Sequence, residues 1–134
     1  MDEMKLKAIG VIRRDDAGSS ARDELVRVEV ADEHAEGLHR IEEAEKITVI
    51  FWLDRLPPER RRAMRCHPHG DESLPERGVF ALRAPMRPNP IGVTVVDLVR
   101  RDGNTLYVKG LDALDGSPLI DIKSSGPIPG TGRD

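Results

Sequence analysis

Short apolar stretches separated by turn-forming residues are the feature that most constrains the fold of this 134-residue chain. Several stretches alternate apolar with charged residues, as in residues 25–30, LVRVEV. A period of two residues is typical of a strand with one buried face, whereas a helix needs a period of 3.6. Turn signals lie between the stretches, including Asp102-Gly103-Asn104 and Asp115-Gly116. We predict strands at residues 5–12, 25–30, 47–53, 78–82, 92–100, 105–109 and 118–122.

Helical signals are few. Residues 31–44 carry Leu38 and Ile41 three positions apart, which predicts one or two short helical turns. Residues 57–64 begin with two prolines, which suit a first helical turn. Many short strands with so little helix predict a mainly β fold with short helical segments, either an antiparallel or mixed barrel or a sandwich.

The domain organisation follows from length and continuity. Domains most often have about 100–150 residues, and neither a repeat nor a linker interrupts this sequence. We therefore expect one domain over residues 1–134, with an irregular tail at 126–134. The most apolar run is residues 47–53, ITVIFWL, which predicts a central strand covered on both faces.

Composition limits the partners and the compartment. The net charge of −3 lacks the bulk basicity of a general nucleic-acid binder. A single cysteine, Cys66, excludes an internal disulfide and suits a reducing compartment. The sequence has neither an apolar run of about 20 residues nor an apolar signal core near its start. We expect a cytoplasmic protein that does not contact a membrane.

A local basic cluster is formed by Arg60, Arg61, Arg62 and Arg65. This cluster is either a solvated face or a phosphate-binding patch.

One cluster, Cys66-His67-Pro68-His69, contains side chains that ligate metals. Pro68 splits the pair of histidines, and the CxxC and HExxH spacings are absent. We therefore expect no metal site and interpret these histidines as loop residues that line a cleft or cap a strand. Glycine-rich phosphate loops and the Gly-x-Ser-x-Gly elbow are also missing from the sequence.

Residues 83–94, RAPMRPNPIGVT, combine rigidity with positive charge. Proline restricts its own backbone and that of the preceding residue, so this loop has little freedom to lose on binding. Arg83 and Arg87 present planar guanidinium groups that suit carboxylates and phosphates, and Asn89 lies between two prolines. From the chemistry alone the segment is either a ligand-holding loop or a structural corner whose arginines pair with nearby acids.

Three aspartates follow downstream. Asp115 precedes Gly116, as a tight turn requires. Asp112 lies at a strand end, where a site carboxylate would project. Asp121 is an acid within an apolar strand, so it either faces solvent or is buried and paired.

Two long segments resemble a known family. Residues 78–92, GVFALRAPMRPNPIG, are similar to the signature G-V-F-A-T-R-S-P-x-R-P-N-P-I-G of the TsaA-like (YaeB/TrmO) family. Residues 111–123, LDALDGSPLIDIK, are similar to its second block, L-D-x-x-D-G-T-P-x-x-D-I-K-P-Y. Weaker similarities lie at residues 9–12 and 36–42, so the resemblance covers nearly the whole chain in the expected order.

The resemblance implies a small closed or partly open β-barrel that binds S-adenosylmethionine, usually as a homodimer, and we therefore favour the barrel over the sandwich. Family members methylate N6 of threonylcarbamoyl-adenosine at position 37 of certain tRNAs. Carried over by position, the cofactor contacts would be Asp54, Arg55, Arg83, Val93, Leu111, Asp112, Ala113 and Leu114. We nominate Asp112 as the group that accepts the proton released by the amine. Contacts to tRNA are expected from Arg62, Arg65, Arg87 and Asn89.

The sequence also departs from the family pattern. The cofactor-contacting P-R-Q between the first two strands is absent, and residues 19–23, SSARD, stand in a shortened loop. R-S-P is replaced by Arg83-Ala84-Pro85, K-P-Y by Lys123-Ser124-Ser125, and a histidine common in the family by Asp54. Two alternatives to a tRNA methyltransferase therefore stay open. One is an enzyme acting on a small molecule or protein, and the other is a non-catalytic module that binds adenosylmethionine.

Overall fold

The computed structural model describes residues 2–133, and the chain divides into two compact units. Unit 1 comprises Met1–Trp52 and Gly92–Asp134, and unit 2 comprises Leu53–Ile91. The single domain expected from the sequence stays a prediction.

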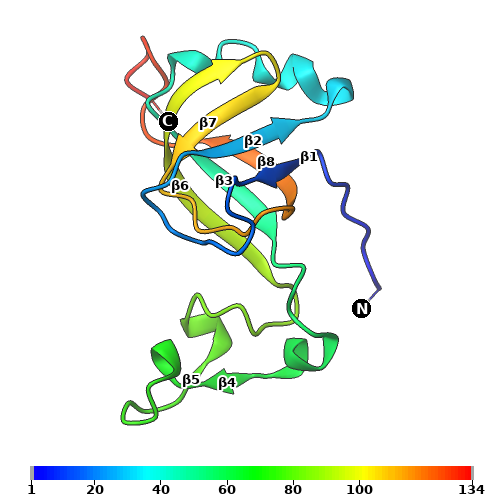
Figure 1. The fold of residues 1–134 in the computed structure, drawn as a ribbon. Helices are drawn as coiled ribbons and strands as arrows, with labels where there is room; N and C mark the ends of the chain where they lie inside the picture. Colours follow the sequence, from blue (N-terminus) through cyan, green and yellow to red (C-terminus); the bar gives the residue numbers. More distant parts are fainter. Residues whose placement is uncertain (1, 134) are drawn as a thin grey trace. The chain divides into compact units, whose positions relative to one another are not determined.

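Unit 1 is built on a closed barrel with the strand order β1-β2-β7-β6-β3-β8 (Figure 1). β1 pairs antiparallel with both β2 and β8, so the sheet closes on itself and leaves no free edge strand. The predicted mainly β class and the predicted barrel are confirmed. The strands are β1 (Gly10–Arg13), β2 (Val26–Val30), β3 (Lys46–Trp52), β6 (Ile91–Asp102), β7 (Thr105–Lys109) and β8 (Pro118–Ser124).

The barrel interior is filled by alternate residues of these strands. In β2, Val26, Val28 and Val30 are buried while the charged residues between them are half-buried. β7 follows the same rule with Leu106 and Val108. Because successive side chains of a strand point to opposite faces, the alternation seen in the sequence becomes one apolar interior.

Two glycines allow barrel elements to approach closely. A Cβ atom on Gly92 would lie 2.4 Å from Cζ of Phe51, whose ring is buried in the barrel. A Cβ atom on Gly10 would lie 2.0 Å from the carbonyl oxygen of Glu29 on the paired strand. Both distances are far below van der Waals contact, so these positions exclude any side chain.

The segment between β2 and β3 forms two short 3-10 helices, η1 (Asp32–Leu38) and η2 (Ile41–Glu43). They confirm the predicted helical turns, and η1 places Leu38 in the core. Within residues 2–133 no helix is long and apolar enough to cross a membrane.

Unit 2 contains short elements only. They are η3 (Pro58–Arg62), β4 (Arg65–Cys66), η4 (Pro68–Gly70), β5 (Arg77–Gly78) and η5 (Val79–Ala81). η3 confirms the short helix predicted after the two prolines, while β4 and β5 form a small antiparallel pair. The strand predicted at residues 78–82 is wrong, because the chain turns into η5 directly after Gly78.

Two further strand predictions need correction. The first strand starts at Gly10 rather than at residue 5, since pairing with β2 begins only there. The strand predicted to be covered on both faces, β3, buries only Ile47, Val49 and Phe51. Its other face is only partly buried, so β3 is not covered on both faces. The tail beyond residue 125 contains turns and one isolated bridge, between Ile128 and Arg133.

We expect Gly92→Ala to destabilise unit 1 by about 1–3 kcal/mol, because the new methyl group overpacks the buried Phe51 ring. The matched control is Gly37→Ala, where no heavy atom lies within 4 Å of the added Cβ. Urea unfolding followed by the fluorescence of Trp52, the single tryptophan, measures both. Equal midpoints for the two variants would contradict the role assigned to Gly92.

Candidate functional site

The arginine-proline loop of unit 2, defined here as residues 83–90, folds around the guanidinium group of Arg87. This group donates hydrogen bonds to the carbonyl oxygens of Ala84 at 2.7 Å, Val79 at 2.8 Å and Leu82 at 2.5 Å. Arg61 adds a bond of 3.0 Å to the carbonyl oxygen of Pro88. The side chain of Arg87 thus links the chain before the loop to the chain within it. The backbone carbonyl groups that it bonds do not need hydrogen bonds from a helix or a sheet.

Arg83 lies next to a hollow of about 680 Å³ within unit 2. Its side chain is exposed, and Arg65, Ala84 and Met86 line the same hollow. The Cys66–His69 cluster also lines it, and Nδ1 of His67 lies 2.8 Å from the carbonyl oxygen of Leu74. The histidines therefore line a hollow, and the residues described gather no group of three metal-ligating side chains.

The other residues predicted in unit 2 are mostly on its surface. Asp54, Arg55, Arg62 and Asn89 are exposed. Arg87 is half-buried, and its guanidinium group is engaged with the three carbonyl oxygens given above. The RNA contact predicted for Arg87 stays a prediction, but the observed contacts assign this residue a role within the loop.

In unit 1 the residues carried over from the second block form the segment Leu111, Asp112, Ala113 and Leu114, called the LDAL segment below. Leu111 and Ala113 are buried, whereas Asp112 and Leu114 are half-buried. The segment leads from β7 to the turn at Gly116, which has a φ of +81°. Val93, on β6, is exposed at 44%.

The carboxylate of Asp112 is held on both oxygens. The hydroxyl of Thr94 donates to Oδ1 at 3.0 Å, and the guanidinium group of Arg22 donates to Oδ2 at 3.1 Å. Thr94 is 9% exposed, so this partner is fixed in the barrel wall. A carboxylate has about four lone-pair sites, so Asp112 keeps the capacity to accept further hydrogen bonds.

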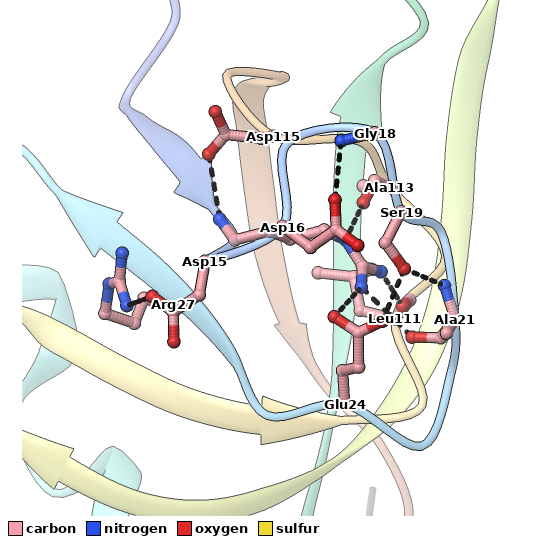
Figure 2. A network of polar contacts seen from close by, with 11 residues as sticks. Asp15, Asp16, Gly18, Ser19, Ala21, Glu24, Arg27, Leu111, Ala113 and Asp115 are labelled. Atoms are coloured by element: carbon pink, nitrogen blue, oxygen red, sulfur yellow. Dashed lines mark hydrogen bonds and ion pairs between the residues drawn. The ribbon is translucent and has the colours of Figure 1, made fainter.

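Two polar residues that the sequence did not single out organise this region. Arg14 has a fully buried side chain, and its Nε donates to the carbonyl oxygen of Ala113 at 2.5 Å. Its NH2 group donates to the carbonyl oxygen of Leu111. Asp115 accepts a bond of 2.8 Å from the backbone N–H of Arg14. Figure 2 shows the Asp115 carboxylate making one such bond. The other residue, Thr94, lies on β6. The sequence did not single it out because it lies among the alternating apolar residues of that strand.

Asp121 is half-buried and lies on β8. Its Oδ1 accepts a bond of 2.8 Å from the backbone N–H of Ile122, and its Oδ2 lies 3.4 Å from Nζ of Lys123. The Asp121 side chain is 48% exposed and its ion pair is with Lys123, so it is paired but not buried as the second alternative required.

The comparisons with known proteins agree with the closed barrel of unit 1 and with the two motif-bearing segments, which lie in different units. Residues 16–127 match the family described as tRNA-methyltransferase O N-terminal domain. This match covers most of the chain, which therefore belongs to that family. The resemblance stated from the two sequence blocks is confirmed.

Relatives of similar length carry a cofactor in their names. The chain is 43% identical over 131 residues to an S-adenosyl-L-methionine-binding protein of Archaeoglobus fulgidus, covering 92% of this chain and 91% of that protein. It is 37% identical over 121 residues to the probable S-adenosyl-L-methionine-binding protein PH1056 of Pyrococcus horikoshii, covering 90% and 85%.

Solved structures of TrmO share the fold. The crystal structure of TrmO from Pseudomonas aeruginosa has a TM-score of 0.70 and 28% identity, and it covers 94% of this chain. The match takes in 57% of the TrmO chain, so this chain spans little more than half of that protein.

The residues present suit the chemistry of S-adenosylmethionine. The exposed Arg83, next to its hollow, offers a guanidinium fork for a carboxylate. The half-buried Asp112 and Leu114 offer peptide groups and one negative charge, which suit a purine edge and a cation. Each unit, taken by itself, thus offers groups that fit one part of the cofactor.

We expect Arg87→Ala to speed tryptic cleavage after Arg83 by about tenfold or more. The variant removes three charge-assisted bonds, and one such bond contributes about 1.5–3 kcal/mol to keeping the loop closed. Timed digestion followed by mass spectrometry measures the rate. The control is Arg60→Ala, an exposed residue of η3. Unchanged cleavage in Arg87→Ala would show that this guanidinium group does not hold the loop.

Proposed function

We propose that the protein binds S-adenosylmethionine and transfers its methyl group to N6 of threonylcarbamoyl-adenosine at position 37 of tRNA. The observation that carries the proposal is family membership over residues 16–127, together with solved TrmO structures of the same fold. The preorganised loop around Arg87 supports it, because a rigid loop lowers the ordering cost of binding a ligand.

Charge distribution supports a nucleic-acid substrate. Unit 2 contains eight arginines and five acidic residues, a formal charge of +3 in a chain whose net charge is −3. Such a local surplus is the electrostatic footprint that phosphate binding requires, even where the whole chain is acidic. The exposed Arg62 and Arg65 belong to this surplus.

The chemistry demands alignment more than acid–base assistance. Bound adenosylmethionine supplies a methyl group on a sulfonium, which leaves as a neutral thioether. N6 forms the new bond to the methyl carbon while the carbon–sulfur bond breaks, and N6 releases one proton. The family resemblance assigns cofactor contacts to the arginine-proline loop. Within unit 1, the oriented carboxylate of Asp112 would accept the proton. The base has to leave its stack in the anticodon loop to reach the site.

Methyl transfer tests this function directly. Protein, methyl-labelled adenosylmethionine and total tRNA lacking the modification are incubated, and label in tRNA is counted. We expect Arg83→Ala to reduce the rate about 10–100-fold, since a hydrogen bond to a charged group contributes about 1.5–3 kcal/mol. Arg13→Ala, an exposed residue of β1, is the control. Absence of label in tRNA with the unaltered protein would overturn the tRNA assignment.

Salt dependence tests the basic surface. We expect the double variant Arg62→Ala with Arg65→Ala to lower the slope of log affinity for tRNA against log salt by about 1–2. The control is Lys7→Ala, which removes an exposed cation from unit 1. A slope that falls equally in the control would show that phosphates do not bind preferentially at unit 2.

A second candidate is a module that binds adenosylmethionine without catalysis. One observation favours it: relatives of nearly this chain's length are named for binding and not for transfer. Calorimetric binding of adenosylmethionine without transfer of label to tRNA, small molecules or protein would select this candidate.

A further inference from the structure

Arg14 is a buried cation directly after β1, at the start of the β1–β2 loop (residues 14–25). Its side chain has no exposed surface. A buried arginine is tolerated only when its N–H groups and its charge find partners. Its partners come from two places far apart in the sequence, namely the β1–β2 loop and the LDAL segment.

On the loop side, NH1 of Arg14 donates to the carbonyl oxygen of Ala21 at 3.0 Å and lies 3.6 Å from Oε2 of Glu24. Ser19 in turn donates to Oε1 of Glu24 and accepts a bond of 3.1 Å from the N–H of Ala21. Figure 2 shows these groups gathered on one loop beside the LDAL segment. The charge of Glu24 thus offsets that of Arg14.

On the other side, the carbonyl oxygens of Leu111 and Ala113 both accept bonds from Arg14. In an extended segment alternate peptide groups face opposite edges, and the alternate burial of these four residues fits that geometry. Arg14 therefore occupies one edge of the LDAL segment, and the peptide group of Asp112 faces the other edge.

The same loop also reaches the side chain of Asp112. The carbonyl oxygen of Arg22 accepts a bond of 2.8 Å from the N–H of Gly110, while its guanidinium group donates to Asp112. Arg22 directly follows Ala21, which Arg14 holds. Arg14 thus contacts the backbone of the LDAL segment directly. It affects the carboxylate of Asp112 indirectly, through the loop residues Ala21 and Arg22.

We propose that Arg14 is a positioning residue that sets the LDAL segment for adenosylmethionine by bonding the carbonyl oxygens of Leu111 and Ala113. The inference rests on the proposed function, because that function assigns the LDAL segment to the cofactor. Arg14 does not contact the cofactor and acts only through the backbone. A lysine cannot replace it, because a point charge on a flexible stem cannot reach three separate carbonyl oxygens at once.

The test compares Arg14→Lys with Arg101→Lys. Arg101 is also an arginine that donates to backbone carbonyl oxygens, those of Leu38 and Gly103, outside the LDAL segment. Amide hydrogen exchange is measured on the ligand-free proteins, and the dissociation constant for adenosylmethionine is measured by calorimetry. Glu24→Gln serves as a milder variant, which keeps Arg14 and its carbonyl partners but removes the neighbouring charge.

In Arg14→Lys we expect exchange at residues 111–115 and 19–24 to rise at least tenfold and the dissociation constant to rise at least tenfold. Exchange in β2 and β7 should stay unchanged. A general loss of stability would raise exchange in these strands as well, so the two explanations can be told apart. Arg101→Lys should change neither quantity, and Glu24→Gln should give smaller changes in the same direction.

Unchanged exchange at residues 111–115 in Arg14→Lys would overturn the proposal. So would faster exchange with an unchanged dissociation constant, which would make Arg14 a structural brace alone. If the unaltered protein binds no adenosylmethionine at millimolar concentration, the proposed function fails together with the positioning role. The exchange data would then still decide whether Arg14 braces the segment.

Discussion

Closure of the barrel is the constraint on which the rest of unit 1 depends. β1 is only four residues long, yet it pairs with β2 on one side and β8 on the other. Because it is so short, the chain leaves it at once into the β1–β2 loop, and β8 is preceded by the turn at Gly116. Closure therefore brings the β1–β2 loop and the LDAL segment together, and Arg14 fills the space between them. Gly10 and Gly92 allow the close approaches that this closure requires.

Both units use the same device to hold irregular chain. In unit 1 the guanidinium group of Arg14 satisfies carbonyl oxygens of two segments, and in unit 2 Arg87 does so for residues 79–84. Loops without ladder hydrogen bonds must pair their polar groups in some other way, and a planar five-donor side chain does this at low entropic cost. The segments held in this way are the two blocks that resemble the family signature. The preorganisation expected of a ligand-binding loop thus has a specific physical source in each unit.

The sequence predicted the strands because they obey a period of two and are separated by residues that favour turns, while the choice of a barrel over a sandwich came from the family resemblance. Asp102-Gly103-Asn104 connects β6 to β7 as expected, with Gly103 at a φ of +61°. The prediction failed where local pattern and tertiary pairing disagree. Residues 78–82 contain strand-forming side chains, but they lack a neighbouring strand beyond Gly78 and so turn into η5.

The site was predictable only in part. The arginine-proline loop and Asp112 were visible as unusual combinations of charge, rigidity and position. Arg14 was not, because a charged residue next to a polar turn normally faces solvent, and only the closed barrel buries it. Thr94 was not identified for a related reason. The alternation of apolar residues in β6 does not predict which inward-facing residue bonds a carboxylate.

The measurement that tests the central claim most directly is a titration of ¹⁵N-labelled protein with S-adenosylmethionine, followed by amide chemical shifts. The account predicts saturable shifts concentrated at residues 111–115 and 83–94. Shifts concentrated elsewhere, such as around η1 and the tail beyond residue 125, or no shifts at millimolar cofactor, would contradict it.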